Sequence, residues 1–375
     1  MSNIDAHLES PHRNQLIDFL RGLCLVVMTV DHRPHDIFEA FTWQTFGFIS
    51  AAEGFVFLSG LSSGLVYGRV AIQRGINSAC RRIWRRALIL YFANAALITF
   101  TILAAKEKIA LLERGIQPGW SLWFKSLLCI EAPGYAEILR LYFFFFLLLP
   151  LVFWAFVRRK FLPVILVSAG LWLASALGYG LVAFQELGYF DPISWQLLFV
   201  AGAYFGFTSI QTGDELEAPL MVSALSFLTF SAFLLLRHWH FLTGHARPAY
   251  FQWLLEWRRT LPFARVLDFT VFTILVYDVR RPLVRFAKTF PGQAIAFLGR
   301  HSLQVFMWSV SISVVMAEVD RRRPNASMLE HSMITSAVLI SCFLPAWLHK
   351  KWQGLFYAWR ASNHIEEPAI PSVVS

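Results

Sequence analysis

The sequence carries little charge. Asp, Glu, Lys and Arg make up 15% of its 375 residues, whereas soluble domains carry about 25%. Hydrophobic residues make up 57%, and the mean hydropathy is +0.53. A water-soluble globule is therefore excluded. Apolar runs recur along the chain, each close to the roughly 20 residues that a helix needs to cross a bilayer, and they indicate an integral membrane protein.

Cysteine and the common catalytic motifs are scarce or missing. The four cysteines form no C-x-x-C pair and no metal-ligand spacing, so we expect neither a disulfide framework nor a zinc site. No GxGxxG, P-loop, HExxH or G-x-S-x-G motif stands out, which argues against nucleotide hydrolysis, zinc peptidase and serine esterase activity. We expect no metal cofactor. No internal repeat is visible either.

The positive charge is distributed as in a membrane protein. The formal net charge is +9 and the pI is about 9.6, a balance that in a soluble protein suggests a nucleic-acid partner. Here the arginine clusters lie beside apolar segments, where basic loops set the orientation of the chain. We therefore expect the lipid bilayer as a partner and no nucleic acid.

Ten segments are candidates for transmembrane helices. They lie at about 15–33, 48–68, 84–104, 136–157, 161–183, 193–210, 218–236, 262–279, 294–317 and 332–349. Basic groups after the second, fourth, eighth and tenth segments fall on one side, which the positive-inside rule makes cytoplasmic. The predicted fold is an all-α integral membrane protein, a bundle of about ten helices with both termini cytoplasmic. Residues 1–14 are an N-terminal segment, 15–350 a single polytopic domain and 351–375 a tail.

Two long segments fall on the opposite side of the membrane. Residues 105–135 and 237–261 are rich in tryptophan and are interrupted by Pro118, Pro133 and Pro248. Tryptophan is enriched at membrane interfaces, so we expect interfacial or re-entrant structure there. A substrate that arrives from the outer side would meet these segments.

The first predicted helix carries a polar stripe. At 100° per residue, Asp18, Arg21, Thr29 and His32 fall within an arc of about 80°. Arg21 and His32 are about 16 Å apart along the helix axis. Charged groups in membrane helices are costly and are by default candidates for a functional site. The stripe therefore predicts a site that extends from the cytoplasmic half towards the outer half of the bilayer.

His32 is the candidate general base in this stripe. Asp31 precedes it, and a histidine oriented by a carboxylate is suited to deprotonate a hydroxyl near neutral pH. The alternative is that residues 31–34 simply end the helix at the interface, because Asp31 lies about 100° from His32 on a regular helix.

Glu53 and a glycine stripe mark the second predicted helix. Gly60, Gly64 and Gly68 recur every four residues, and Glu53 lies seven residues before Gly60 on the same face. Glu53 is therefore expected to face protein, either as a partner of His32 or a ligand for an acceptor hydroxyl, or as one half of a structural salt bridge. The stripe is typical of close helix packing, within the chain or in a homodimer.

Two basic elements are candidates for binding a cytoplasmic cofactor. Guanidinium groups match phosphate geometry, which makes arginine clusters suited to a phosphate-bearing cofactor. For the cluster at the start of the third predicted helix, ordinary positive-inside anchoring is the alternative. Arg300 lies with His301 in the ninth predicted span and must face the interior or the cytoplasmic boundary. The first element, at the start of the third predicted helix, consists of Arg81, Arg82, Arg85 and Arg86.

Four short segments carry a resemblance to a known family. They are Ile17-Asp18-Phe19-Leu20-Arg21-Gly22 leading to Asp31-His32, Ala52-Glu53-Gly54-Phe55-Val56-Phe57-Leu58-Ser59-Gly60, Ser194-Trp195-Gln196-Leu197-Leu198-Phe199, and Gly299-Arg300-His301-Ser302-Leu303. With them the chain resembles, from about residue 12 to about 350, the OpgC branch of the membrane acyltransferases, related to the acyltransferase type 3 group. Arg21-x10-His32 is similar to the Arg/Lys-x10-His signature of the wider group. Residues 55–60 are similar to its Phe-Phe-x-x-Ser-Gly element, with Val56 where that group often has Phe.

The resemblance implies an enzyme of the inner membrane of a Gram-negative bacterium. It would move a succinyl group from cytoplasmic succinyl-CoA to hydroxyls of an osmoregulated periplasmic glucan. The CoA phosphates would dock near Arg81, Arg82, Arg85, Arg86 and Arg300. His32 would act as the base with Asp31 or Glu53 orienting it, by direct attack or through an acyl-histidine.

Several alternatives stay open at the level of the sequence. Arg21 is expected to attract the donor or to pair with Asp18, and the succinyl carboxylate has three candidate partners, Arg21, Arg140 and Arg300. A transporter or flippase of a sugar or anion is the competing class, although such proteins commonly show related halves. Acetyl-CoA as donor, or another polysaccharide as acceptor, is a further alternative.

Overall fold

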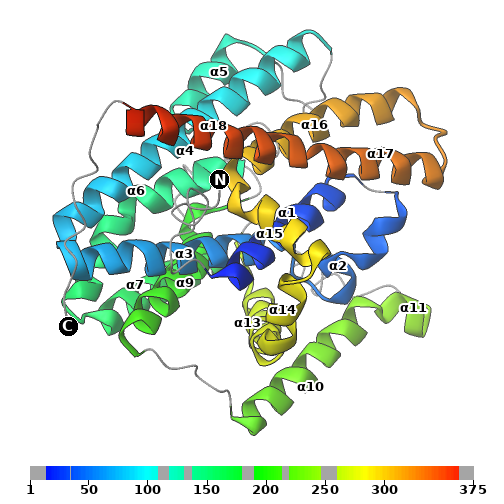
Figure 1. Ribbon diagram of the computed structural model, residues 1–375. Coiled ribbons are helices and arrows are strands. Elements are labelled where there is room, and N and C mark those ends of the chain that lie inside the picture. Colours follow the sequence, from blue (N-terminus) through cyan, green and yellow to red (C-terminus); the bar gives the residue numbers. More distant parts are fainter. Residues whose placement is uncertain are drawn as a thin grey trace.

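The computed structural model describes residues 14–33, 35–108, 118–130, 137–179, 190–212, 219–245 and 260–362. Throughout these ranges the chain forms helices and no strand (Figure 1). The elements are α1 (Gln15–Asp31), η2 (Ile37–Phe41), α2 (Trp43–Phe46), α3 (Ala51–Arg74), α4 (Ile76–Lys106), α5 (Trp120–Leu127), α6 (Glu137–Val157), α7 (Phe161–Ala176), α9 (Pro192–Thr212), α10 (Leu220–Arg237), α11 (Trp239–Thr243), α13 (Phe263–Asp278), α14 (Arg280–Ala287), α15 (Phe290–Arg300), α16 (Ser302–Arg322), α17 (Met328–Ser341) and α18 (Phe343–Ser362).

The helices agree with a multi-pass membrane protein. Seven helical stretches of the described chain are long and apolar enough to cross a bilayer, and they lie in α3, α4, α6, α9, α10, α16 and the α17–α18 pair. The other three predicted spans coincide with α1, α7 and α13, which are shorter helices of 17, 16 and 16 residues. The all-helical membrane class is therefore confirmed.

The two C-terminal predicted spans differ from the observed helices. The segment 294–317 is divided at His301, so that Arg300 ends α15 and Ser302 begins α16. The segment 332–349 is divided at Cys342, and Pro345 then lies in the first turn of α18, where its missing N–H breaks no helical hydrogen bond. α18 continues to Ser362, so the first part of the predicted tail is helical.

The predicted outer segments are described only in part. The range 105–135 contains α5, and the range 237–261 contains α11. Residues 109–117, 131–136 and 246–259 lie outside the described residues, as do 1–13 and 363–375 at the two ends.

α3 and α9 pack closely, because glycines face each other across the pair. A Cβ atom on Gly60 would clash with the carbonyl oxygen of Phe199, and one on Gly202 would clash with that of Phe57. Small residues let membrane helices approach until their backbones touch. The stripe of Gly60, Gly64 and Gly68 therefore packs inside this chain against α9, and a homodimer would have to use another surface.

The segment between α1 and α3 returns into the bundle. Trp43 packs on Phe272 of α13 with ring centroids 5.3 Å apart, and the Phe48 N–H donates to Asp268 Oδ2 at 2.8 Å. α3 consequently begins near the middle of α1, where Gly54 lies against Cys24. This return places the first turns of α3 beside Arg21.

Candidate functional site

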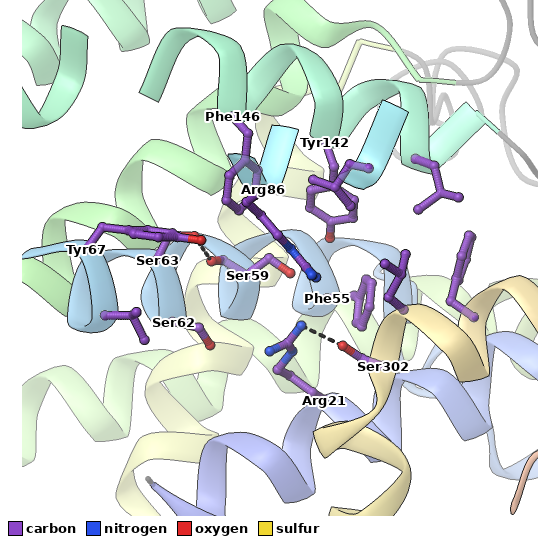
Figure 2. A pocket seen from close by; sticks show the side chains of 15 residues that line it. Arg21, Phe55, Ser59, Ser62, Ser63, Tyr67, Arg86, Tyr142, Phe146 and Ser302 are labelled. Atoms are coloured by element: carbon purple, nitrogen blue, oxygen red, sulfur yellow. Dashed lines mark hydrogen bonds between the residues drawn. The ribbon is translucent and has the colours of Figure 1, made fainter. Parts of the chain in front are cut away.

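A cavity of about 200 Å³ lies in the bundle between α1, α3, α4, α6 and α16. Figure 2 shows its side chains converging from these helices. The pockets that enclose whole small molecules measure about 300–1,000 Å³, so this one has room for part of a substrate. Its lining consists of Arg21, Phe55, Ser59, Ser62, Ser63, Val66, Tyr67, Arg86, Leu90, Leu139, Tyr142, Phe146, Ser302, Leu303 and Phe306.

One face of α3 supplies the long wall of the cavity. Lining residues recur there from Phe55 to Tyr67 at helical spacing, a length of about 18 Å along the axis. The Ser62 and Ser63 hydroxyls donate to the helix carbonyls of Leu58 and Ser59, each at 2.8 Å. Their oxygen lone pairs remain available as acceptors. The wall therefore offers hydroxyl groups at intervals along a narrow slot.

Arg21 extends from α1 into this slot. Its Nη2 donates to Ser302 Oγ at 2.7 Å, and its guanidinium carbon lies 5.8 Å from the centre of the Phe55 ring. The break at His301 starts α16 at Ser302, and so brings this hydroxyl to Arg21. The structure thus places Arg21 inside the bundle, as the polar stripe predicted.

Arg86 extends into the same cavity from α4. It is half-buried and lines the cavity, whereas Arg81, Arg82 and Arg85 are exposed and do not. In Figure 2 the side chains of Arg21 and Arg86 enter from opposite sides and point towards each other. The arginine cluster predicted to bind a cofactor therefore divides into one residue inside the cavity and three on the surface beside it.

His32 lies at the C-terminal end of α1, away from the residues that line the cavity. It is the C-cap residue, and its backbone N–H donates to the Met28 carbonyl at 3.1 Å. Asp31 is the last residue of the helix, and both side chains are half-buried. His32 lies eleven positions after Arg21, which is about 16 Å along the axis. Any reaction that uses both residues needs an extended substrate between them.

The neighbour of His32, Arg33, is fixed by α16 and α17. Its Nη2 pairs with Asp320 Oδ1 at 3.2 Å and its Nε donates to Thr335 Oγ1 at 3.2 Å. His331 Nδ1 lies 3.7 Å from the same Asp320 oxygen. This cluster anchors the C-terminal end of α1, next to His32.

Glu53 is fully buried and has well-defined partners. The Ser50 N–H and hydroxyl donate to its Oε2 at 2.9 and 2.6 Å, and the Arg265 Nε donates to its Oε1. These bonds satisfy the carboxylate and cap the start of α3. The geometry favours the structural salt bridge over a role beside His32.

Arg300 ends α15 and does not line the cavity. The next residue, His301, places its Nδ1 2.8 Å from Nδ1 of His349 on α18. Arg140 is buried on α6, where its Nη1 donates to the Ile130 carbonyl at 3.4 Å. Of the three arginines considered for a carboxylate from the sequence, only Arg21 lies in the cavity.

Sequence reasoning missed Arg265, Asp268, Tyr142 and the role of Ser302. The signal for the first two was present, because Arg265 and Asp268 are a charged pair inside an apolar predicted span. Tyr142 and Ser302 carry no such signal, since single hydroxyl residues are common in membrane helices. Among the described residues, no group of three or more His, Cys, Asp or Glu side chains is arranged to hold a metal ion.

Comparison with known proteins identifies one family. No curated protein and no solved structure matches the chain significantly. The family described as OpgC protein matches residues 13–354. This range includes α1 with Arg21 and His32, the wall of α3, and the break at His301. The resemblance seen in the short segments is thereby confirmed over nearly the whole chain, which belongs to the OpgC family.

Proposed function

We propose that the protein is a transmembrane O-acyltransferase that moves a succinyl group from cytoplasmic succinyl-CoA to hydroxyls of a periplasmic glucan. OpgC-family membership supports a role in modifying osmoregulated periplasmic glucans. The cavity is the observation that carries the rest, because it is a narrow, hydroxyl-lined slot with two arginines inside a membrane bundle. The enzyme lies in the inner membrane, with ten crossings and both termini cytoplasmic.

The donor enters from the cytoplasmic side in this proposal. Arg81, Arg82 and Arg85 bind the CoA phosphates at the exposed start of α4, with Arg300 as a further candidate. The pantetheine arm then extends along α3, where the serine and tyrosine hydroxyls meet its amide groups. A slot of about 18 Å suits an extended arm, and its small volume excludes the adenosine end.

Transfer takes place towards the outer end of α1. His32 takes the proton from a glucan hydroxyl while the hydroxyl oxygen attacks the thioester carbonyl. The C–S bond breaks, and the CoA thiolate leaves towards the cytoplasm and is protonated there. Asp31 is the candidate that orients the imidazole, since Glu53 is engaged by Arg265. An acyl-histidine relay would use the same residue as nucleophile.

Direct binding tests the donor. Isothermal titration of the purified protein in detergent with succinyl-CoA, acetyl-CoA and free CoA is expected to show binding that prefers the succinyl thioester. The Arg82→Ala/Arg85→Ala variant should bind all three more weakly. If the folded wild-type protein binds no CoA species, the proposal is wrong and a transporter or flippase becomes the better hypothesis, because polar groups in a bundle also line transport paths. If acetyl-CoA binds best, the enzyme is an acetyltransferase.

A further inference from the structure

The two arginines of the cavity form an unusual electrostatic environment. Among the described lining residues, two are arginine and none is acidic. Arg86 forms no salt bridge with any carboxylate of the described chain. A cation inside a helix bundle attracts anions more strongly than one on the surface, because less solvent screens it. The cavity therefore favours a substrate segment that carries negative charge.

The size of the cavity limits which segment that is. The phosphates of an acyl-CoA lie at its bulky nucleotide end, whereas the acyl group is the slender tip that enters first. Arg86 lies one position beyond the exposed Arg85, and its side chain points into the cavity towards that of Arg21 (Figure 2). In the proposed reaction, the anion that reaches this point is therefore a carboxylate at the end of the acyl chain.

We propose that Arg86, together with Arg21, is the specificity determinant that selects carboxylate-tipped acyl donors over uncharged acyl groups of the same length. This inference rests on the proposed acyltransferase function and assigns its acyl selectivity to a residue. Guanidinium groups bind carboxylates through paired N–H donors. The hydrogen bond from Arg21 Nη2 to Ser302 Oγ, 2.7 Å long, holds one of the two guanidinium groups in place.

The position of the pair defines when selection occurs. Arg21 lies about 16 Å from His32 along α1, and a four-carbon acyl group cannot span that distance. In the donor complex without acceptor the carboxylate therefore rests on the arginines, and the thioester reaches His32 only when the donor advances along the slot for transfer. Selection is therefore visible in donor binding, without an acceptor.

The test compares succinyl-CoA with butyryl-CoA, in which a methyl group replaces the carboxylate. Affinities of both thioesters and of free CoA are measured for the wild-type protein and for Arg86→Met, whose side chain fills similar space without charge. The succinyl-to-butyryl affinity ratio is expected to fall by about 50-fold in Arg86→Met, the range of a hydrogen bond to a charged group. Affinities for butyryl-CoA and free CoA should change much less, which also shows that the variant is folded.

Arg85→Met is the matched control, one position away and exposed. This variant should weaken the binding of all three ligands to the same extent and leave the succinyl-to-butyryl affinity ratio unchanged. Arg86→Lys keeps the charge but loses the paired N–H donors. It should therefore retain part of the preference for succinyl-CoA over butyryl-CoA. If Arg86→Met weakens the three ligands equally, Arg86 binds the CoA part and the inference is overturned. If the wild-type protein binds no CoA species, the proposed function itself fails.

Discussion

At the scale of single residues, the polar groups of α1 were the most informative part of the sequence. Arg21 was predicted to face the interior because charge in a membrane helix needs a protein or solvent partner, and it lies in the cavity. Arg265 was missed as the partner of Glu53, because 212 residues separate them along the chain. Local periodicity shows which face of a helix is buried, but not which distant helix covers it.

His32→Ala is expected to abolish succinyl transfer while the protein still binds succinyl-CoA. A general base contributes about 10²–10⁴ in rate, and Arg21, in the cavity proposed to hold the donor, lies about 16 Å away along α1. The measurement is transfer of labelled succinate from succinyl-CoA to a periplasmic glucan preparation. His35→Ala is the control, since His35 is exposed three residues later. Substantial activity in His32→Ala would remove His32 from the base role.

Glu53→Gln is expected to destabilise the bundle rather than to act on catalysis directly. The change leaves the buried Arg265 guanidinium without its carboxylate, which costs about 3–5 kcal/mol in comparable cases. Thermal unfolding in detergent should show a large decrease in Tm. The double variant Glu53→Gln/Arg265→Met should recover stability and activity together. A stable but inactive double variant would instead show that Glu53 takes part in the reaction.

At the scale of elements, most helices follow from hydropathy, while their ends follow from local chemistry. The predicted second span began at residue 48, and α3 begins at Ala51, after a segment that folds back into the bundle. Its capping by Ser50 and Glu53 is visible in the sequence as S-x-x-E, a capping box. The break at His301 has no comparable signal. Beside it Gly299 packs against the backbone of Asp18 in α1 and His301 contacts His349 in α18, and no local pattern encodes these contacts.

Gly60→Ala is expected to destabilise the α3–α9 pair by about 1–3 kcal/mol, the range of overpacking a close contact. The added methyl group would meet the backbone of Phe199. Gly170→Ala is the matched control, because nothing lies within 4 Å of a Cβ atom at this position in α7, and it should leave stability unchanged or higher. Thermal unfolding of both variants is the measurement. Equal stability of the two would contradict backbone contact between α3 and α9.

At the scale of the whole molecule, the proposed topology places the start of α4 in the cytoplasm and the α16–α17 connection outside. Single cysteines at Asn77 and Asn325, both exposed, can test this in a background without the four native cysteines. A membrane-impermeant maleimide should label Asn325→Cys in intact spheroplasts. Asn77→Cys should react only after permeabilisation. The reverse pattern would invert the orientation, and with it the side from which the donor enters.

The position of His32 at the end of α1, outside the lining of the cavity, has a consequence for the kinetics of substitution. In the proposed reaction the glucan does not enter the cavity, so one hydroxyl at a time approaches His32 while the rest of the glucan stays in the periplasm. Ring size and chain length then have little influence on each encounter. Each hydroxyl is modified independently, and the number of substituents per molecule should follow a broad statistical distribution set by donor supply and contact time.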